Sequence, residues 1–158
     1  MGVRLVTPQS EVSMYLIQSL RIIHEEVKRT LLRLGEESIT KVRDRSGEES
    51  WFDRSGNLRS SVGYALYESG RKEFESAFSI VKQGAEGAEE GRRMVEELTH
   101  EYSNTYALVV VAAMNYAEYV EAMENKDVLA SAELFARGKV NEYLNKALQR
   151  AERRISKL

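Results

Sequence analysis

The feature that most constrains the fold is a change of hydrophobic period at residues 51–64, WFDRSGNLRSSVGY. Before this stretch apolar residues recur every three or four positions, as in a helix, and after it the period drops towards two, as in a strand. Within it, Ser55-Gly56-Asn57 is a turn signal, because Gly and Asn tolerate positive φ. We expect a turn, a short polar run and then the first strand of a sheet, without a catalytic motif.

A long helix is predicted over most of residues 8–45. Thr7 is a suitable N-cap, and Pro8 suits the first helical position. One apolar stripe follows at helical spacing and predicts the buried face: Leu16, Leu20, Ile23, Val27, Leu31 and Leu34. Gly35 predicts either an end or a kink, and we favour a helix that continues past it.

A β-hairpin is predicted next. Val62, Tyr64 and Leu66 share one face of its first strand, and Gly63, Ala65 and Tyr67 share the other. Glu68-Ser69-Gly70-Arg71 supplies the reversal. In the second strand Phe74, Phe78 and Ile80 alternate with polar residues, which predicts one buried face and one wet face.

The remainder of the chain predicts further helices around a buried strand. Three glycines, Gly84, Gly87 and Gly91, predict a helix that is frayed or mobile at its start. Residues 105–114 are apolar on both faces and predict a central strand. Asn115 and Glu118 fit a helical capping box. From about Ser131 a last helix places one set of residues on its buried side: Leu134, Val140, Leu144, Ala147, Ala151 and Ile155.

These elements predict an α+β fold, in which a small antiparallel sheet of three to four strands packs against a long N-terminal helix and a C-terminal helix. The 158 residues suffice for a single domain spanning 1–158. A formal charge of −2 gives no basic field to recruit nucleic acid, and no cysteine is present for disulfides or thiolate metal sites. Neither a membrane-spanning run nor a signal peptide is recognisable, so synthesis in a cytoplasm is expected.

Candidate chemistry is sparse. His24 and His100 lack the partners of a metal site and are expected to face solvent or pack between helices. The glycines at 84–91 do not form a phosphate loop, because no Lys-Ser/Thr pair follows them. Glu118 and Glu121 lie three residues apart on one helix, whereas a glycosidase holds its two carboxyl groups across a cleft. We expect no catalytic residue, no metal and no cofactor.

Tyrosines gather in and around the predicted sheet: Tyr64, Tyr67, Tyr102, Tyr106, Tyr116 and Tyr119. Tyrosine tolerates a half-wet site and is enriched at protein interfaces. We expect most of them in the core and one or two at an interface.

Two motifs together carry a resemblance to a known family. Gly56, Leu58, Arg59 and Ser61 stand in a Ser-Gly-Asn-Leu-Arg-Ser-Ser turn before the sheet, and Tyr116, Tyr119, Val120 and Glu121 stand in a Tyr-Ala-Glu-Tyr-Val-Glu stretch after the later strand. This order resembles the neck, or tail-completion (minor tail), proteins of long-tailed bacteriophages. In that family an aromatic-Gly-Thr turn often follows the second motif, whereas residues 122–127 here read Ala-Met-Glu-Asn-Lys-Asp.

The resemblance implies a non-enzymatic structural protein of a phage or prophage virion. Its partners would be further copies of itself in a ring, the portal or head-closure protein, and the tail tube or tail terminator protein. DNA would meet it only by passing through the ring lumen, and no membrane would be involved. It would be made in the host bacterial cytoplasm and reside in the neck of the particle.

Two other functions stay open from the sequence. One is a different virion component, such as a tail terminator or a capsid-associated protein. The other is a small enzyme that uses Glu118, Glu121 or Asp53 together with a tyrosine, which predicts a deep pocket holding a carboxyl group of raised pKa.

Trp51 and Phe52 form an aromatic pair beside a connector that is expected to be exposed. They are either a latch on the chain's own long helix or an anchor for a neighbouring subunit, and we favour the latch. Residues 48–53 and 82–91 are candidate loops that become ordered on assembly.

Overall fold

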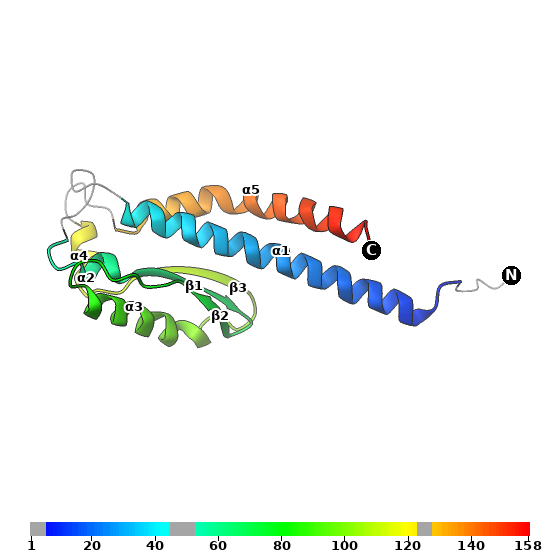
Figure 1. Ribbon diagram of the computed structural model, residues 1–158, viewed down its shortest axis with the longest axis horizontal. Coiled ribbons are helices and arrows are strands. Elements are labelled where there is room, and N and C mark those ends of the chain that lie inside the picture. Colours follow the sequence, from blue (N-terminus) through cyan, green and yellow to red (C-terminus); the bar gives the residue numbers. More distant parts are fainter. Residues whose placement is uncertain (1–5, 45–52, 123–127) are drawn as a thin grey trace. The chain divides into compact units, whose positions relative to one another are not determined.

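The computed structural model describes residues 6–44, 53–122 and 128–158 (Figure 1). In chain order its elements are α1 (Gln9–Arg43), α2 (Asn57–Ser60), β1 (Val62–Glu68), β2 (Arg71–Glu75), α3 (Ala85–Glu97), the 3-10 turn η1 (Leu98–His100), β3 (Tyr106–Ala112), α4 (Ala117–Ala122) and α5 (Ala130–Ile155). None of the helices in the described part of the chain is long and apolar enough to cross a membrane.

The chain divides into two compact units. One consists of residues 1–30 and 141–158, and the other of residues 31–140. The first is called the helix-pair unit below, because it holds the N-terminal part of α1 and the C-terminal part of α5. The second holds the sheet and is called the sheet unit. The division into two units does not test the single-domain assignment, which stays a prediction.

The sheet has three antiparallel strands in the order β2-β1-β3. Tyr64 pairs with Val110, and Leu66 with Leu108, in a regular register between β1 and β3. The hairpin of β1 and β2 is therefore confirmed. The prediction that residues 105–114 form the central strand is wrong, because β1 takes the centre and β3 lies at an edge. Both strands are apolar on both faces, so composition did not distinguish the centre from the edge.

One face of the sheet packs against the C-terminal part of α1 and the start of α5. Ile39 and Val42 of α1, with Ala132 of α5, join Val62 and Tyr64 of β1 in one buried cluster. Arg43 of α1 also donates hydrogen bonds to the carbonyl of Val62 and, at 3.4 Å, to that of Ala77. The α+β prediction, with a sheet packed on the N-terminal and C-terminal helices, is confirmed.

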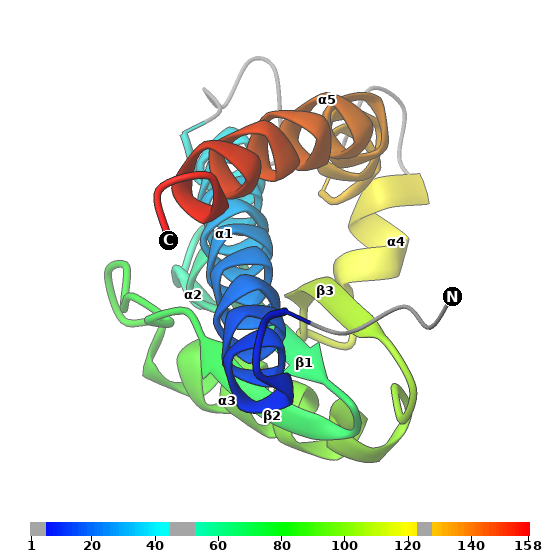
Figure 2. The same cartoon turned by 90° about the vertical axis from the view of Figure 1, so that its right-hand side faces the viewer.

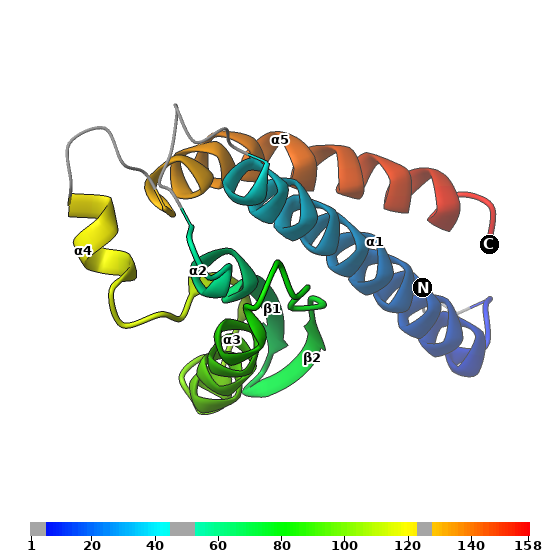
Figure 3. The same cartoon turned by 60° about the vertical axis from the view of Figure 1, so that its left-hand side comes forward.

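The opposite face is covered by α3 (Figure 3). Ala65 and Tyr67 point to this side and cluster with Ala88 and Val95 of the helix. The Tyr67 hydroxyl donates a hydrogen bond to the carbonyl of Val95, which satisfies the one polar atom of a fully buried ring. Burial raises the pKa of this tyrosine to about 12. The predicted alternation of β1 between its two faces is therefore correct.

The second strand is shorter than predicted. β2 ends at Glu75, and the Oγ of Ser76 accepts the next bond, 2.9 Å from the Tyr64 amide nitrogen. Phe78 lies beyond the strand and is buried, but Ile80 is exposed. A Cβ atom on either Gly63 or Gly91 would overlap the Phe78 ring, so this ring fills the space that two glycines leave. The alternation of apolar and polar residues in the sequence therefore extends beyond the last residue of β2.

The last helix begins within one residue of the predicted start. Ala147 and Ala151 are buried as predicted, but Leu134 is 72% exposed and does not belong to the buried side. The predicted stripe on α1 is likewise only half correct. Leu31 and Leu34 are buried, whereas Leu16 and Leu20 are exposed.

Gly35 neither ends nor interrupts α1, which is helical from Gln9 to Arg43. A Cβ atom at this position would lie 2.5 Å from two ring carbons of Tyr64. The Tyr64 ring is held in place, because the residue is 1% exposed and its hydroxyl donates a 2.9 Å hydrogen bond to Glu36. Gly35 therefore provides close approach of the helix to the sheet and does not end the helix.

Gly35→Ala adds a methyl group that overpacks against the buried Tyr64 ring, at a cost of about 1–3 kcal/mol. Ala gains roughly 1 kcal/mol over Gly within a helix, so we expect a net destabilisation of up to about 2 kcal/mol. Gly138 in α5 is the matched control, since a Cβ there meets nothing within 4 Å. Gly138→Ala should stabilise by up to about 1 kcal/mol. Urea unfolding of both variants measures the difference, and two stabilised variants would contradict the assignment.

Candidate interaction surfaces

The first motif forms a one-turn helix, α2, in place of the predicted polar run. Gly56 precedes it with φ 86°, and a Cβ there would overlap the carbonyl of Val81. Leu58 and Ser61 are buried, and the Ser61 hydroxyl donates a 2.8 Å hydrogen bond to the Leu58 carbonyl. Of the four motif residues, these three therefore serve the fold of the sheet unit and are not available to a partner.

Arg59, the fourth residue of this motif, links α2 to the end of α1. Its Nη1 donates a 2.6 Å hydrogen bond to the carbonyl of Arg43, the last residue of α1. Carbonyls at a helix C-terminus lack intrahelical partners, and a cation there also complements the helix dipole. Arg59 thus acts as a C-terminal cap from a distant part of the chain.

Asp53 closes the start of the same motif. One of its carboxylate oxygens accepts a 2.9 Å hydrogen bond from the Gly56 amide, and the other accepts a 2.9 Å bond from the Arg59 amide. The residue is only 9% exposed. Both oxygens satisfy amide groups at the start of α2, which an isolated helical turn would leave without partners. Asp53, considered from the sequence as part of a possible enzyme site, is occupied by this structural role.

The three glycines around the start of α3 allow the helix to touch α2. A Cβ on Gly87 would overlap the carbonyl of Asn57, and one on Gly84 would overlap the Ser60 hydroxyl and the Gly56 carbonyl. Residues 85–91 form the first turns of α3, so the prediction of a loop over residues 82–91 is wrong for most of that range. The helix-propensity cost of these glycines is offset by close backbone packing that no other residue permits.

The second motif lies next to the first. Tyr116 forms a side-chain hydrogen bond with Ser55 and lies near the carboxylates of Asp53 and Glu86. Burial raises the pKa of Tyr116, and the two carboxylates act in the same direction, whereas the bond to Ser55 acts against them. The structure therefore brings together two motifs that are about 60 residues apart in the sequence.

The remaining residues of the second motif differ in exposure. Helix α4 begins at Ala117, and the Tyr116 carbonyl accepts the first backbone bond, from Val120, so the predicted cap at Asn115 is displaced by one residue. Val120 packs on the cluster that includes Ile39 and Val42, but Tyr119 is 67% exposed. Of the predicted tyrosines, Tyr116 and Tyr119 are the two that remain available to a partner. The side chain of Glu121, together with Trp51 and Phe52, lies outside the described residues.

Carboxylates outside these motifs do not converge. Glu118 is exposed on α4. In the described ranges no three His, Asp or Glu side chains are placed to hold a metal ion. Among the described residues, the carboxyl groups of Glu25 and Glu26 have pKa values lowered by hydrogen bonds from arginines, which is opposite to the shift expected of a general acid.

Glu26 is the centre of a hydrogen-bond network in the helix-pair unit, and this role was not predicted from the sequence. It is 2% exposed and accepts hydrogen bonds from Arg150 at 2.8 Å and from Arg154 at 3.0 Å. Arg150 also donates to the Thr30 hydroxyl, and Arg154 to Glu25, both at 2.8 Å. These bonds join the N-terminal part of α1 to the C-terminal part of α5, which lie side by side and antiparallel (Figure 2). Arg150 and Arg154 near the end of α5 therefore bind carboxylates of α1 across the helix pair.

Ahead of this network, the first turns of α1 carry no buried residue. All residues from 6 to 18 are exposed, and residues 9–20 contain one charged side chain, Glu11. Four large apolar side chains lie on one side of this segment, within roughly 140° of the helix circumference: Val12 at 43%, Leu16 at 55%, Ile17 at 66% and Leu20 at 66% exposure. We call these four residues the α1 stripe. Their helical spacing predicted a buried face, whereas the structure leaves all four side chains exposed.

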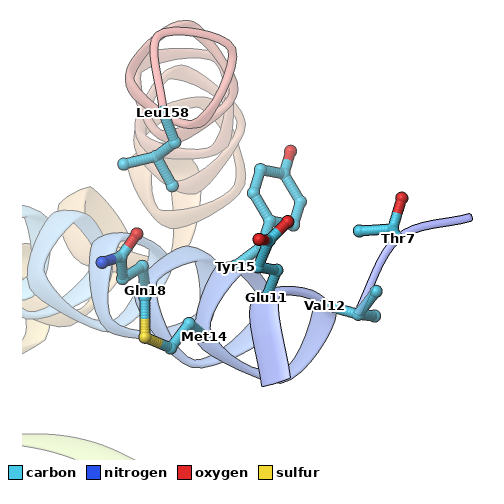
Figure 4. Close-up of a pocket in the computed structure, with 7 residues that line it drawn as sticks. All are labelled: Thr7, Glu11, Val12, Met14, Tyr15, Gln18 and Leu158. Atoms are coloured by element: carbon cyan, nitrogen blue, oxygen red, sulfur yellow. The ribbon is translucent and has the colours of Figure 1, made fainter. Parts of the chain in front are cut away.

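A hollow of about 430 Å³ lies beside the stripe. Figure 4 shows its lining, which comes from Val12, Met14, Tyr15 and neighbouring residues of α1 together with Leu158 at the end of the chain. Tyr15 and Met14 are themselves 47% and 59% exposed. The exposed apolar surface therefore extends from the stripe into a recess within the helix-pair unit.

No protein-family model, curated protein or solved structure matches this chain.

Replacing Asp53 by Ala removes both acceptors at the start of α2 and is expected to cost about 1–2 kcal/mol of stability. Asp53→Asn keeps one oxygen acceptor and should cost roughly half as much. Asp44, an exposed aspartate just after α1, provides the control, and Asp44→Ala should change stability by less than about 0.5 kcal/mol. Chemical denaturation ranks the three variants, and equal losses in all of them would refute the capping role.

The carboxylate of Glu26 should make the helix pair sensitive to acid. Its pKa is lowered in the folded state from an ordinary value of 4.5, so its ion pairs contribute stability above that pH and lose it as pH falls through the lowered pKa. Glu26→Gln should cost roughly 1.5–3 kcal/mol at pH 7. At pH 3 the gap between variant and wild type should be smaller.

The matched control is Glu142→Gln, which breaks an exposed pair with Lys146 and should cost less than about 1 kcal/mol at pH 7. Thermal unfolding by circular dichroism between pH 7 and pH 3 gives the comparison. If the stability loss caused by Glu26→Gln is the same at pH 7 and pH 3, then the negative charge of Glu26 does not stabilise the helix pair.

Proposed function

We propose that this chain is a structural protein of a phage or prophage virion, a ring-forming adaptor of the neck that joins the head connector to the tail tube. The observation that carries the proposal is the α1 stripe, whose apolar side chains are between 43% and 66% exposed. A protein that works alone in water rarely leaves such a continuous apolar surface on a helix. An assembly protein covers it with its neighbours.

The local structure of α1 supports an assembly role as well. Residues 9–20 include Val12, Ile17 and three serines, all of which favour a helix less than Ala or Leu does. Most helical stability in proteins comes from packing of an apolar face, and residues 9–18 of α1 are all exposed. A partner that covers the α1 stripe would therefore also stabilise the first turns of α1.

The two family motifs support the proposal in a different way. Gly56, Leu58 and Arg59 build the turn between α1 and the sheet, and Tyr116 rests against that turn. A resemblance carried by such residues is a resemblance of fold. The neck role therefore rests on that resemblance together with the exposed stripe.

Disrupting the gene in the phage or prophage that carries it tests the role directly. The expected result is filled heads and separate tails in the lysate, with joined infectious particles restored by a plasmid copy. Electron microscopy of particles carrying a tagged copy should place the protein between head and tail. Infectious joined particles from the disrupted genome would refute the proposal, and a label elsewhere on the particle would favour a different virion component.

A further inference from the structure

We infer that the α1 stripe of one copy docks on the sheet unit of a second copy, so that the contact repeats head to tail around the ring. The inference rests on the proposed ring and adds which surface meets which. The α1 stripe is thus covered by another copy of the same chain.

The helix-pair unit and the sheet unit carry formal charges of opposite sign. The helix-pair unit, residues 1–30 and 141–158, contains nine Lys and Arg against five Asp and Glu, a formal charge of +4. The sheet unit, residues 31–140, contains 14 against 20, a formal charge of −6. The whole chain has a formal charge of only −2, so opposite charge is segregated between the units. Two copies therefore attract each other when the helix pair of one meets the sheet unit of the other.

The same charges disfavour the symmetric alternative. Packing two α1 stripes against each other would bring together two units of +4, and like charges across an interface oppose association. A contact between two different surfaces is also the type that closes into a ring, whereas a symmetric contact closes a dimer. Electrostatics and the geometry of rings therefore select the same arrangement.

The apolar α1 stripe determines where on the helix-pair unit the second copy binds. Around the stripe, residues 9–20 contain only Glu11 as a charged residue, whereas basic side chains such as Arg29 and Arg153 are exposed elsewhere in the same unit. An apolar centre within a charged surface is the usual composition of a protein interface. The hollow beside Val12 and Tyr15 offers a recess for a side chain of the second copy.

Sedimentation velocity on the full chain, over a concentration series up to about 1 mM, tests the association. We expect concentration-dependent self-association at 50 mM salt that weakens several-fold at 500 mM, because the Debye length falls from about 14 Å to about 4 Å. Association that strengthens with salt would favour the symmetric contact and overturn the inference. A chain that stays monomeric throughout would overturn it as well.

Leu16→Ser with Leu20→Ser removes apolar area without changing charge. Each substitution is expected to weaken association roughly tenfold, as the loss of a buried leucine does. Because both side chains are exposed in the single chain, circular dichroism of the diluted variant should match the wild type. Leu148→Ser is the matched control, an exposed leucine of the same unit on α5, and should change association less than twofold. Equal weakening by the control would remove the assignment to α1.

The absence of cysteine in the chain allows the second surface to be identified. Ile17→Cys, labelled with a benzophenone maleimide, is mixed with unlabelled chains grown in ¹⁵N and irradiated, so that mass spectrometry separates contacts between copies from contacts within one. Crosslinks to ¹⁵N peptides from residues 31–140 are the expected result. Crosslinks to ¹⁵N peptides from residues 1–30 or 141–158, or none between copies, would overturn the inference. Asn145→Cys on α5 serves as the control site.

The outcome is independent of the gene-disruption experiment. Separate heads and tails from a chain that is monomeric in solution would keep the neck role and remove this contact. The opposite result is also possible: the protein associates head to tail in solution, but disrupting its gene still leaves joined infectious particles. That result would keep the contact and remove the neck role.

Discussion

The contact on which the sheet unit depends is that of the Tyr64 ring with Gly35. Tyr64 lies on the central strand, and its ring occupies the space where any residue other than glycine at position 35 would place its Cβ atom. Its hydroxyl is bound to Glu36, and its amide to Ser76, so the residue connects the long helix, the sheet and the end of the hairpin. A buried tyrosine with its polar atoms satisfied can hold three elements in one arrangement.

Close approach through glycine recurs on the other side of the sheet. Phe78 fills the space left by Gly63 and Gly91, and Gly87 brings α3 against the backbone of α2. In each case a missing side chain lets a ring or a backbone occupy the space, and a dense core follows. Each of these glycines is specified by a contact that is distant in the sequence. Local propensity therefore predicts mobility at Gly87 and Gly91, where the structure has close packing.

The sequence predicts elements that local periodicity specifies and misses features that tertiary contacts decide. The two faces of β1 follow from the two-residue period of any strand, and the long helix follows from its spacing of apolar residues. Periodicity does not report where the partner of a helix stops, so Leu16 and Leu20 were expected to be buried with Leu34. Glu26 resembles any surface glutamate, because the arginines that bind it lie about 120 residues away.

The candidate surfaces obey the same distinction. Gly56, Leu58, Arg59 and Ser61 form the first motif of the resemblance, and their contacts connect the long helix to the sheet. These residues are engaged in building the turn. The α1 stripe has no such structural role, and its four apolar side chains are exposed. Its segregated charge, +4 on one unit and −6 on the other, allows one sequence to carry both halves of a contact.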